Sequence, residues 1–354
     1  MPRACVIGAT GFIGKRAVAV LAKSGFEVRA THRAGSSLPA ELTTPGVELV
    51  ASDVTDLASL VAAVAECEVV VNCAGIYRWW MPDPAVYTRI NVDGARNVAI
   101  ACNEHVCVRH LVHISTAMAY GYPAEKPFNE SSKPGPHAAE YPRTKFLGDE
   151  AVVDVHAQAS CRLTILYLAC VTGPGDTFAV GRPSAVYRDF MLGKIPLLVA
   201  PDTKYIYVHI RDVEQAISTV CSGKEAGEPR PVQRYLIGNS EDMLTTRQYF
   251  ELMSKFCDRP CPSLSLNLSV GMLLGRLLTL VSTWITGREP LMPLDIMRTA
   301  AWGGIEYDCG RSRAELRLEY TPIEIAVGEA MRDVKEQLGM ELEPSAKESG
   351  KKSC

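Results

Sequence analysis

Short apolar runs alternate with helical patterns through the first half of the chain. The runs are ACVIG (4–8), EVRATH (27–32), VELVAS (47–52), EVVVNC (68–73), HLVHIS (110–115) and LTILYL (163–168). Helical patterns lie between them, near 12–24, 56–66, 84–106 and 141–159. Continuous apolar strands separated by helices are typical of a parallel sheet covered on both faces. We therefore predict an α/β fold with a doubly wound parallel sheet, whose ligand crevice lies at the carboxyl ends of the strands.

The pattern changes after residue 172. The turn-rich stretch VTGPGDTF precedes a short helix near 183–192, and YIYVHIRDVEQAI indicates a strand that leads into a helix. Beyond about residue 225 there are helices, prolines and one clear strand, RYLIG. We expect a first domain over 1–172 that also takes 205–224. A smaller, mostly helical substrate-binding lobe would cover 173–204 and 225–342, and the charged end, 343–354, is expected to be disordered.

A glycine-rich turn joins the first predicted strand to the first predicted helix. In VIGATGFIG, Gly8, Gly11 and Gly14 have the spacing GxxGxxG. Glycines at such a turn let the backbone approach a pyrophosphate, whose charge is favoured at the helix N-terminus. The motif predicts a Rossmann-type dinucleotide site. The residues expected to bind the cofactor here are Gly8, Thr10, Gly11, Phe12, Ile13 and Gly14.

The end of the second strand indicates which dinucleotide is bound. NAD sites usually carry an Asp or Glu there, whereas the 2′-phosphate of NADP needs a cation. The sequence EVRATHRAG offers no carboxylate at this position and places Arg33 there, beside His32. Arginine can bind a phosphate with two hydrogen bonds. NADP(H) is therefore favoured, and NAD(H) stays open if Arg33 is only a solvated loop residue.

Two further strand ends are expected to contact the cofactor. ASDVTD places Asp53 and Val54 after the third strand, where a carboxylate could accept a hydrogen bond from the adenine amino group. VVVNCAG places Asn72, Ala74 and Gly75 after the fourth, where small residues let the chain run close to the cofactor. For Asn72, a simple turn-forming role before glycine is an equal alternative.

The stretch AEYPRTKFLGDE contains Tyr141 and Lys145, four residues apart. A lysine one helical turn away faces the same side as the tyrosine and favours its phenolate form. Pro142 is compatible with a helix that begins near Tyr141, because amides of the first turn have no partner within the helix. The strand HLVHIS ends in Ser115 and is followed by Thr116, so either hydroxyl could orient a substrate carbonyl at the crevice.

The combined order of these motifs resembles the extended short-chain dehydrogenase/reductase superfamily. The matching pieces are GATGFIG, DVTD, NCAG, HISTAMAYG and YPRTK, with NVDGARNV, GPGD and YVHIRDV as further landmarks. The stretches VRATHR and CAGIYRWWMPDP resemble the dihydroflavonol 4-reductase and 3β-hydroxysteroid dehydrogenase branch. The resemblance implies that Thr116, with Ser115 adjacent, carries the catalytic hydroxyl and that Tyr141 is the acid/base. It also implies that Lys145 binds the nicotinamide ribose and lowers the tyrosine pKa, and that the protein forms a homodimer.

Two departures from the family pattern narrow the chemistry. Nucleotide-sugar dehydratases carry Asp-Glu after the catalytic threonine, but here Ala117 and Met118 follow Thr116. Without those carboxylates, dehydration lacks its acid and base. Tyr167 and Leu168 replace the common Arg-Pro, so the substrate contacts of that segment are not carried over.

Bulky apolar residues follow the fourth strand and begin the second lobe. Tyr77, Trp79, Trp80 and Phe178 are the expected substrate residues, and a pocket of this kind suits a lipophilic ketone or alcohol. The segment 266–286 is strongly apolar, but Arg276 interrupts it. We interpret it as a helix of the substrate-binding lobe and not as a transmembrane span. Peripheral contact with a membrane, with Arg276 reaching the head groups, is the alternative.

Composition limits the remaining classes. A formal net charge of −3 gives no basic surface for nucleic acid. The twelve cysteines lack metal-ligand spacing, so we expect no metal site and free thiols in a reducing, cytoplasmic compartment.

The sequence thus predicts an NADP(H)-dependent oxidoreductase that interconverts an alcohol and a ketone or aldehyde. Its substrate is expected to be bulky and hydrophobic, like an isoprenoid, steroid or flavonoid. A nucleotide-sugar 4-epimerase with tightly bound NAD and a non-catalytic dinucleotide-binding regulatory protein are the alternatives.

Overall fold

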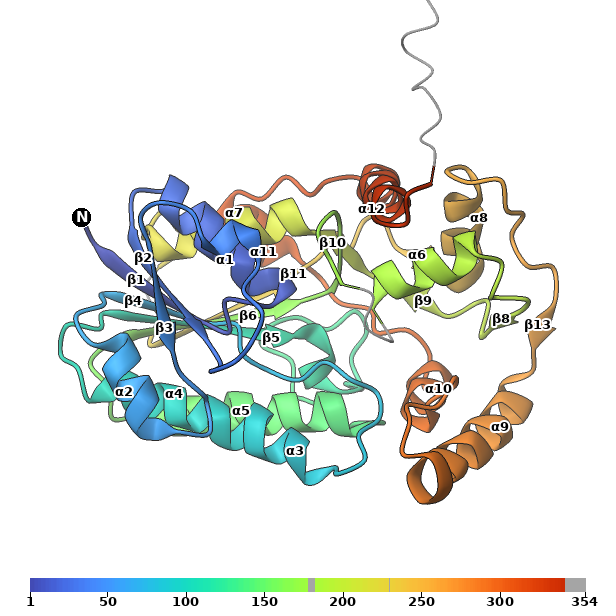
Figure 1. Ribbon diagram of the computed structural model, residues 1–354, viewed down its shortest axis with the longest axis horizontal. Helices are drawn as coiled ribbons and strands as arrows, with labels where there is room; N and C mark the ends of the chain where they lie inside the picture. The colour runs from blue at the N-terminus through green and yellow to red at the C-terminus, as the bar shows by residue number, and fades with distance from the viewer. Residues whose placement is uncertain (178–181, 229, 341–354) are drawn as a thin grey trace, which may run out of the picture.

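A seven-stranded parallel sheet forms the centre of the protein in the computed structural model, which describes residues 1–177, 182–228 and 230–340 (Figure 1). The strand order is β11-β6-β5-β4-β1-β2-β3. The strands are β1 Arg3–Ile7, β2 Glu27–His32, β3 Val47–Ala51, β4 Val69–Asn72, β5 His110–Thr116, β6 Arg162–Leu168 and β11 Val232–Ile237. Phe178 and the expected disordered end, 343–354, lie outside the described residues.

Helices cover both faces of the sheet (Figure 1). One face carries α1 Phe12–Lys23, α7 Ile210–Cys221 and α11 Gly310–Leu316. The other carries α2 Leu57–Val64, α3 Ala85–Tyr87, α4 Gly94–Asn103 and α5 Glu140–His156. All seven residues of β5 are buried, as expected for a central strand with helices above and below it. The predicted doubly wound parallel sheet is confirmed.

The expected helix over 84–106 contains a change of pitch. Between α3 and α4, residues Thr88–Asp93 form a π-helical turn, η2. Such turns inside helices are frequent at functional sites. Here the turn contains Asn91, whose side chain is buried beneath the carboxyl end of β4.

A second core lies beside the carboxyl ends of the strands. It joins α6 Pro183–Met191, α8 Thr246–Ser254 and α12 Ile323–Gln337. Three separate two-stranded sheets accompany this lobe: β7 Cys170–Thr172 with β10 Tyr207–His209, β9 Lys204–Tyr205 with β12 Leu244–Thr245, and β8 Leu198–Val199 with β13 Ser265–Leu266. Below it in Figure 1, α9 Leu268–Val281 continues into the π-helical turn η4 Ser282–Thr286 and returns as α10 Leu294–Ala301.

Two segments expected in the substrate-binding lobe belong to the core of the main sheet instead. β11 pairs with β6 as the edge strand, and Leu316 and Leu318 are buried in the same core. The physical reason is that Tyr235, Leu236 and Ile237 are fully buried, which requires a neighbouring strand and a covering helix. The expected boundary at residue 225 was therefore wrong for these segments.

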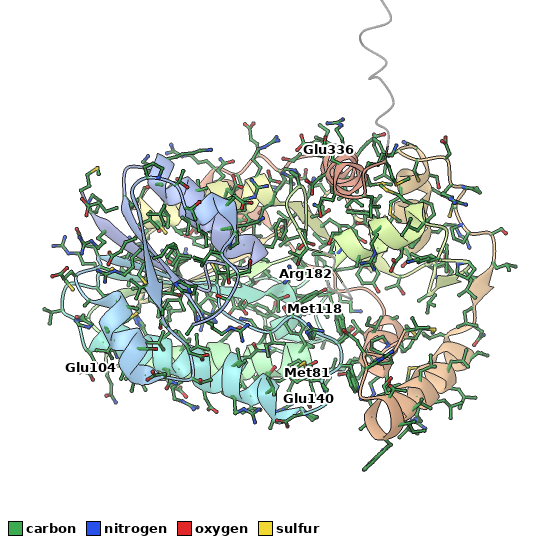
Figure 2. The ribbon with its side chains drawn as sticks, in the orientation of Figure 1. Met81, Glu104, Met118, Glu140, Arg182 and Glu336 are labelled. Atoms are coloured by element: carbon green, nitrogen blue, oxygen red, sulfur yellow. The ribbon has the colours of Figure 1, made fainter. Side chains whose placement is uncertain are left out.

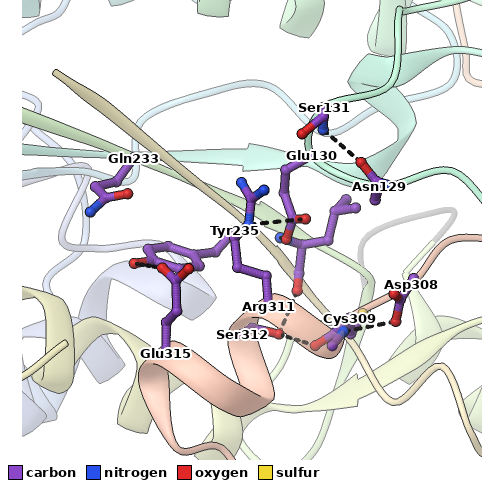
Figure 3. Close-up of polar contacts among 12 residues, drawn as sticks. Asn129, Glu130, Ser131, Gln233, Tyr235, Asp308, Cys309, Arg311, Ser312 and Glu315 are labelled. Atoms are coloured by element: carbon purple, nitrogen blue, oxygen red, sulfur yellow. Dashed lines mark hydrogen bonds and ion pairs between the residues drawn. The ribbon is translucent and has the colours of Figure 1, made fainter. Parts of the chain in front are cut away.

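A buried polar network fixes α11 to this edge strand (Figure 3). Glu130 Oε1 accepts a hydrogen bond from Leu236 N at 2.9 Å, and its other carboxylate oxygen lies 3.7 Å from Arg311. Ser312 Oγ donates to Leu236 O at 2.8 Å. Because an edge strand otherwise offers unpaired backbone groups, these contacts close the outer side of the sheet.

Candidate active site

The glycine loop leaves the amides at the start of α1 open toward an anion. Gly8 has a φ of +77°, and a Cβ there would lie 2.8 Å from the Ala74 backbone, so the loop excludes a side chain at this point. α1 follows Gly11 with no side-chain cap and no acidic residue in its first turn. Such an N-terminus favours negative charge. The loop therefore fits the pyrophosphate of a dinucleotide. Its other predicted residues are half-buried or buried: Thr10, Ile13, Phe12 and Gly14.

Arg33 lies at the end of β2 with an exposed side chain. Its carbonyl accepts a hydrogen bond from Ser36 Oγ at 2.7 Å, which holds the turn. Within the described ranges, its guanidinium has no hydrogen bond or ion pair with protein. The charge of Arg33 nevertheless reaches Asp53, because it contributes, after hydrogen bonds from Thr55, to holding the pKa of that carboxyl below its usual range.

Asp53 and Asn72 bind the backbone of their own loops. Asp53 Oδ1 accepts hydrogen bonds from Thr55 N at 2.9 Å and from Thr55 Oγ1 at 2.7 Å. Asn72 Oδ1 accepts from Ala74 N at 3.1 Å, and its Nδ2 lies 3.1 Å from His113 Nδ1. The two side chains thus shape the strand ends. Val54 lies next to Asp53 in the loop after β3, and Ala74 and Gly75 lie in the loop after β4 that begins beyond Asn72.

Asn91 is a site residue that we did not single out from the sequence. Its Oδ1 accepts a hydrogen bond from Ile76 N at 2.8 Å, and its Nδ2 donates to Thr144 Oγ1 at 3.1 Å. A Cβ on Gly75 would lie 3.3 Å from Asn91 Oδ1 and 3.9 Å from Lys145 Nζ. Asn91 therefore fixes the loop after β4 to α5 beside the lysine. The landmark NVDGARNV was the available signal.

The end of β5 and the first turn of α5 bring Thr116 and Tyr141 together. The Thr116 hydroxyl is hydrogen-bonded to the Tyr141 phenol. α5 begins one residue before Tyr141, so Pro142 lies in the first turn, as the sequence predicts. Lys145 is buried one turn further along, and its Nζ donates to Ile114 O at 2.9 Å. The three predicted catalytic side chains thus come from the end of β5 and the first two turns of α5.

Ser115 points away from this group, because neighbouring residues of a strand face opposite sides. Its Oγ donates to Asp149 Oδ2 at 2.7 Å, and Asp149 Oδ1 lies 3.2 Å from His113 Nε2. All three side chains are buried. Of the two hydroxyls left open by the sequence, only that of Thr116 reaches Tyr141. Asp149 was missed, although its position one helical turn after Lys145 was a usable signal.

The electrostatics keep the tyrosine neutral. Burial raises the pKa of Tyr141, and the hydrogen bond from Thr116 and the charge of Arg182 oppose this rise. Burial also lowers the pKa of Lys145, while the carboxylate of Asp149 opposes that shift. At neutral pH the Tyr141 phenol therefore holds its proton and can donate it. Arg182, from the lobe beyond the sheet, is a further charged group that the sequence did not reveal.

Aromatic rings surround the phenol. The rings of Tyr77 and Trp79 meet that of Tyr141 edge-on, with centroids 5.0 and 5.9 Å away. Ile76, Met81, Met118 and Ile296 pack against the same cluster. Figure 2 shows Met81, Met118 and Arg182 between the sheet and the second lobe. Trp80, in contrast, turns to η4 and donates to Thr283 Oγ1 at 3.3 Å.

Other features of the described residues offer no competing centre. A cavity of about 630 Å³ lies between the loop before β9, the start of α9 and the segment after α10. Thr116, Tyr141 and Lys145 do not line it. No group of three His, Cys, Asp or Glu side chains that could hold a metal ion occurs in the described ranges.

The fold and the Thr116–Tyr141–Lys145 arrangement define an NAD(P)-dependent enzyme of the short-chain dehydrogenase/reductase type. Residues 4–238 match the model of the NAD dependent epimerase/dehydratase family, and the chain belongs to that family.

Relatives in this family differ in activity. The chain is 24% identical over 336 residues to a Synechocystis sp. protein named "Putative dihydroflavonol 4-reductase", covering 92% of each chain. It is 24% identical over 288 residues to N-acetyl-alpha-D-glucosaminyl-diphospho-ditrans,octacis-undecaprenol 4-epimerase of Escherichia coli O157:H7, covering 80% of this chain and 81% of that one. The crystal structure of gox2253 superposes with a TM-score of 0.80 at 21% identity, covering 96% of this chain and all of that one.

Proposed function

We propose that the protein is an NADP(H)-dependent oxidoreductase that interconverts a secondary alcohol and a ketone, or an alcohol and an aldehyde, on a bulky lipophilic substrate. The observation that carries this proposal is the apolar wall around the reacting phenol. Tyr77 and Trp79 contact Tyr141 directly, and the remaining neighbours in this cluster are aliphatic or aromatic. A hydrocarbon ring or chain gains more from such a wall than a hydroxylated sugar does.

The residues act on the proton and on orientation. When bound, the nicotinamide supplies or accepts the hydride at the carbonyl carbon. In reduction, Thr116 Oγ1 orients the substrate oxygen and Tyr141 Oη gives its proton to that oxygen, so that a hydride and a proton together form the alcohol. Lys145 brings a positive charge beside Gly75 that favours the phenolate left behind. The rings of Tyr77 and Trp79 exclude water from the proton transfer.

The cofactor preference of the proposal depends on Arg33. Its exposed guanidinium lies at the strand end where a 2′-phosphate would be bound. Because no described protein group neutralises it directly, it is available to pair with that phosphate. The family description itself specifies NAD dependence.

The test measures NADPH oxidation by the full-length protein with a panel of lipophilic ketones and aldehydes. Tyr141→Phe should lower kcat/KM by about 10²–10⁴-fold while nucleotide binding is retained. The matched control is Tyr122→Phe, which removes a phenol hydroxyl bonded to the Thr299 carbonyl and should leave turnover unchanged. Unaltered turnover in Tyr141→Phe would refute the assignment.

A nucleotide-sugar 4-epimerase is the second candidate, because one relative is named UDP-glucuronate 4-epimerase 1. It requires tightly bound NAD that is regenerated in each cycle. If the purified protein contains stoichiometric NAD and interconverts UDP-sugars without added nucleotide, the epimerase is correct. Nucleotide binding without hydride transfer to any substrate would instead indicate a regulatory binding protein.

A further inference from the structure

In the helix α9 and its continuation η4, the large apolar side chains face solvent, which is the opposite of an ordinary surface helix. A surface helix turns its apolar side inward and its polar side to water. Here the large apolar side chains recur every three or four residues on the outer side and are exposed. They are Val270, Leu273, Leu274, Leu277, Leu280, Val281, Trp284 and Ile285. At 3.6 residues per turn they form one continuous outward face.

The inner side carries mostly small and polar residues, together with the half-buried Leu278. A Cβ on Gly271 or Gly275 would lie 3.4 or 3.0 Å from Met297 of α10, so these glycines let the two helices approach closely. Thr279 Oγ1 accepts a hydrogen bond from Leu294 N at 3.1 Å, and Ser282 is buried. The helix is thus fastened to the protein through its small and polar side, and the apolar side is left without a protein partner in the described residues.

The length and composition of the segment point to lipid. Leu268–Thr286 is the one helix within the described ranges that is long and apolar enough to cross a membrane, and only 17% of its most apolar stretch is buried. Its inner contacts with α10 argue for lying along a bilayer surface, because crossing the bilayer would break them. Exposed apolar faces of this size mark interaction sites.

The charges around the face match an anionic surface. Within residues 262–288 the only charged residues are Arg276 and Arg288, and both are exposed. Arg276 lies at the edge of the apolar face, from which its stem can follow the hydrocarbon while the guanidinium reaches a phosphate. Trp284, with 81% of its surface exposed, has the amphipathic ring that favours the membrane–water interface. An anionic bilayer would repel carboxylates near the face, whereas a second copy of the chain would not. The absence of carboxylates from residues 262–288 therefore favours lipid as the partner.

The same segment touches the wall of the candidate active site. Trp80 donates to Thr283 of η4, and Arg78 pairs with Glu289 at 2.9 Å. Ile296 of α10 packs in the cluster around Tyr141. The apolar face is therefore linked to the phenol by one short loop and one helix.

We propose that α9 and η4 are an interfacial docking face for a bilayer containing anionic phospholipid. Docking places the loop 76–81 at the lipid surface, so that a lipophilic substrate passes from the bilayer to Tyr141. The proposed membrane docking depends only on the exposed apolar face. The proposed route of the substrate also depends on the proposed function.

The test is flotation of the full-length protein with phosphatidylcholine vesicles, with and without phosphatidylserine. The triple variant Leu273→Gln, Leu277→Gln, Trp284→Gln should lower the bound fraction about tenfold or more, because it removes three large apolar side chains from the face. The matched control carries Val106→Gln, Leu192→Gln and Ile325→Gln, which are exposed apolar residues elsewhere, and should bind like the wild type. Arg276→Gln should weaken binding to the anionic vesicles and leave binding to phosphatidylcholine unchanged.

Tryptophan fluorescence gives a second readout that needs no turnover. Brominated lipid should quench the wild type, and Trp284→Phe should lose most of that quenching. The proposal is overturned if the wild type does not float, or if the triple variant floats equally well. It is also overturned if the triple variant converts a dimer to a monomer without vesicle binding, or if alkaline carbonate fails to release the protein, which would indicate a span. Failure of the oxidoreductase proposal would leave every vesicle measurement unchanged.

Discussion

At the scale of single residues, the site is defined by where hydroxyls and charges point. Thr116 and Ser115 are neighbours in sequence, yet only Thr116 bonds to Tyr141, while Ser115 bonds to Asp149. The alternation of side chains along a strand causes this division. A sequence motif that contains both hydroxyls therefore does not distinguish the reacting one.

The pH dependence follows from the buried phenol. Because burial raises the pKa of Tyr141, the protonated acid needed for reduction is present throughout neutral pH. We expect kcat/KM for reduction to be flat near pH 7, and kcat/KM for alcohol oxidation to rise up to about tenfold per pH unit as the phenolate forms. Thr116→Val removes a hydrogen bond that lowers this pKa and should move the oxidation profile to higher pH. An unshifted profile would show that Thr116 does not act on the phenol.

Arg33 sets the expected nucleotide preference. Replacing it with alanine should raise the KM for NADPH by about 10–100-fold, the loss expected for one charge-assisted hydrogen-bond site, and should leave the KM for NADH nearly unchanged. Steady-state kinetics with both nucleotides measure this. Arg96→Ala, which removes an exposed arginine paired with Asp93, is the control. Equal effects of Arg33→Ala on both nucleotides would contradict the NADP(H) preference.

At the scale of elements, β5 and α5 are joined by a buried polar group as well as by apolar packing. Asp149 on α5 accepts a hydrogen bond from Ser115 on β5, lies beside His113, and opposes the lowered pKa of Lys145. It holds the helix that carries Tyr141 in one rotation against the strand that carries Thr116. Asp149 is thus a positioning residue.

Asp149→Ala should lower the free energy of unfolding by about 1–3 kcal/mol, because it leaves the buried Ser115 hydroxyl without its partner. Urea unfolding followed by circular dichroism measures the change. Asp154→Ala, on the exposed side of the same helix, should change stability by no more than about 0.5 kcal/mol. Equal effects of the two substitutions would show that the contact with β5 adds nothing to stability.

At the scale of the whole molecule, two cores meet where the strands end. The sheet supplies the glycine loop and the Thr–Tyr–Lys group. From the segments beyond it come the charge of Arg182, which opposes the raised pKa of the phenol, and Ile296, which packs against the cluster around it. The reaction centre is therefore complete only when both lobes are folded.

Nucleotide binding should stabilise the whole protein by mass action. NADPH at about a hundred times its Kd should raise the free energy of unfolding by about 2.7 kcal/mol. Gly8→Ala should abolish this gain, because the added Cβ meets the Ala74 backbone and distorts the loop. Gly25→Ala has the same kind of positive φ, +89°, but its Cβ meets nothing within 4 Å. It should lose some intrinsic stability yet keep the full gain from NADPH in thermal unfolding.

The sequence by itself determined the sheet, its helices and the order of the site motifs. Apolar runs, the glycine turn and the Tyr141–Lys145 spacing are local patterns, and backbone geometry converts each into structure without reference to distant residues. The start of α5, with Pro142 in its first turn, is another example, since a first-turn proline costs no hydrogen bond.

Only the tertiary structure decided what depends on packing between distant segments. β11 joined the main sheet because its apolar residues needed β6, and Asn91 became a site residue because a π-helical turn brings it to the loop after β4. The segment 266–286 has the composition of a buried helix. Its apolar face points outward because α10 packs against the opposite side, which carries Gly271, Gly275 and Thr279. The pattern of the segment shows its two sides, but only the position of α10 in the folded protein decides which of them is covered.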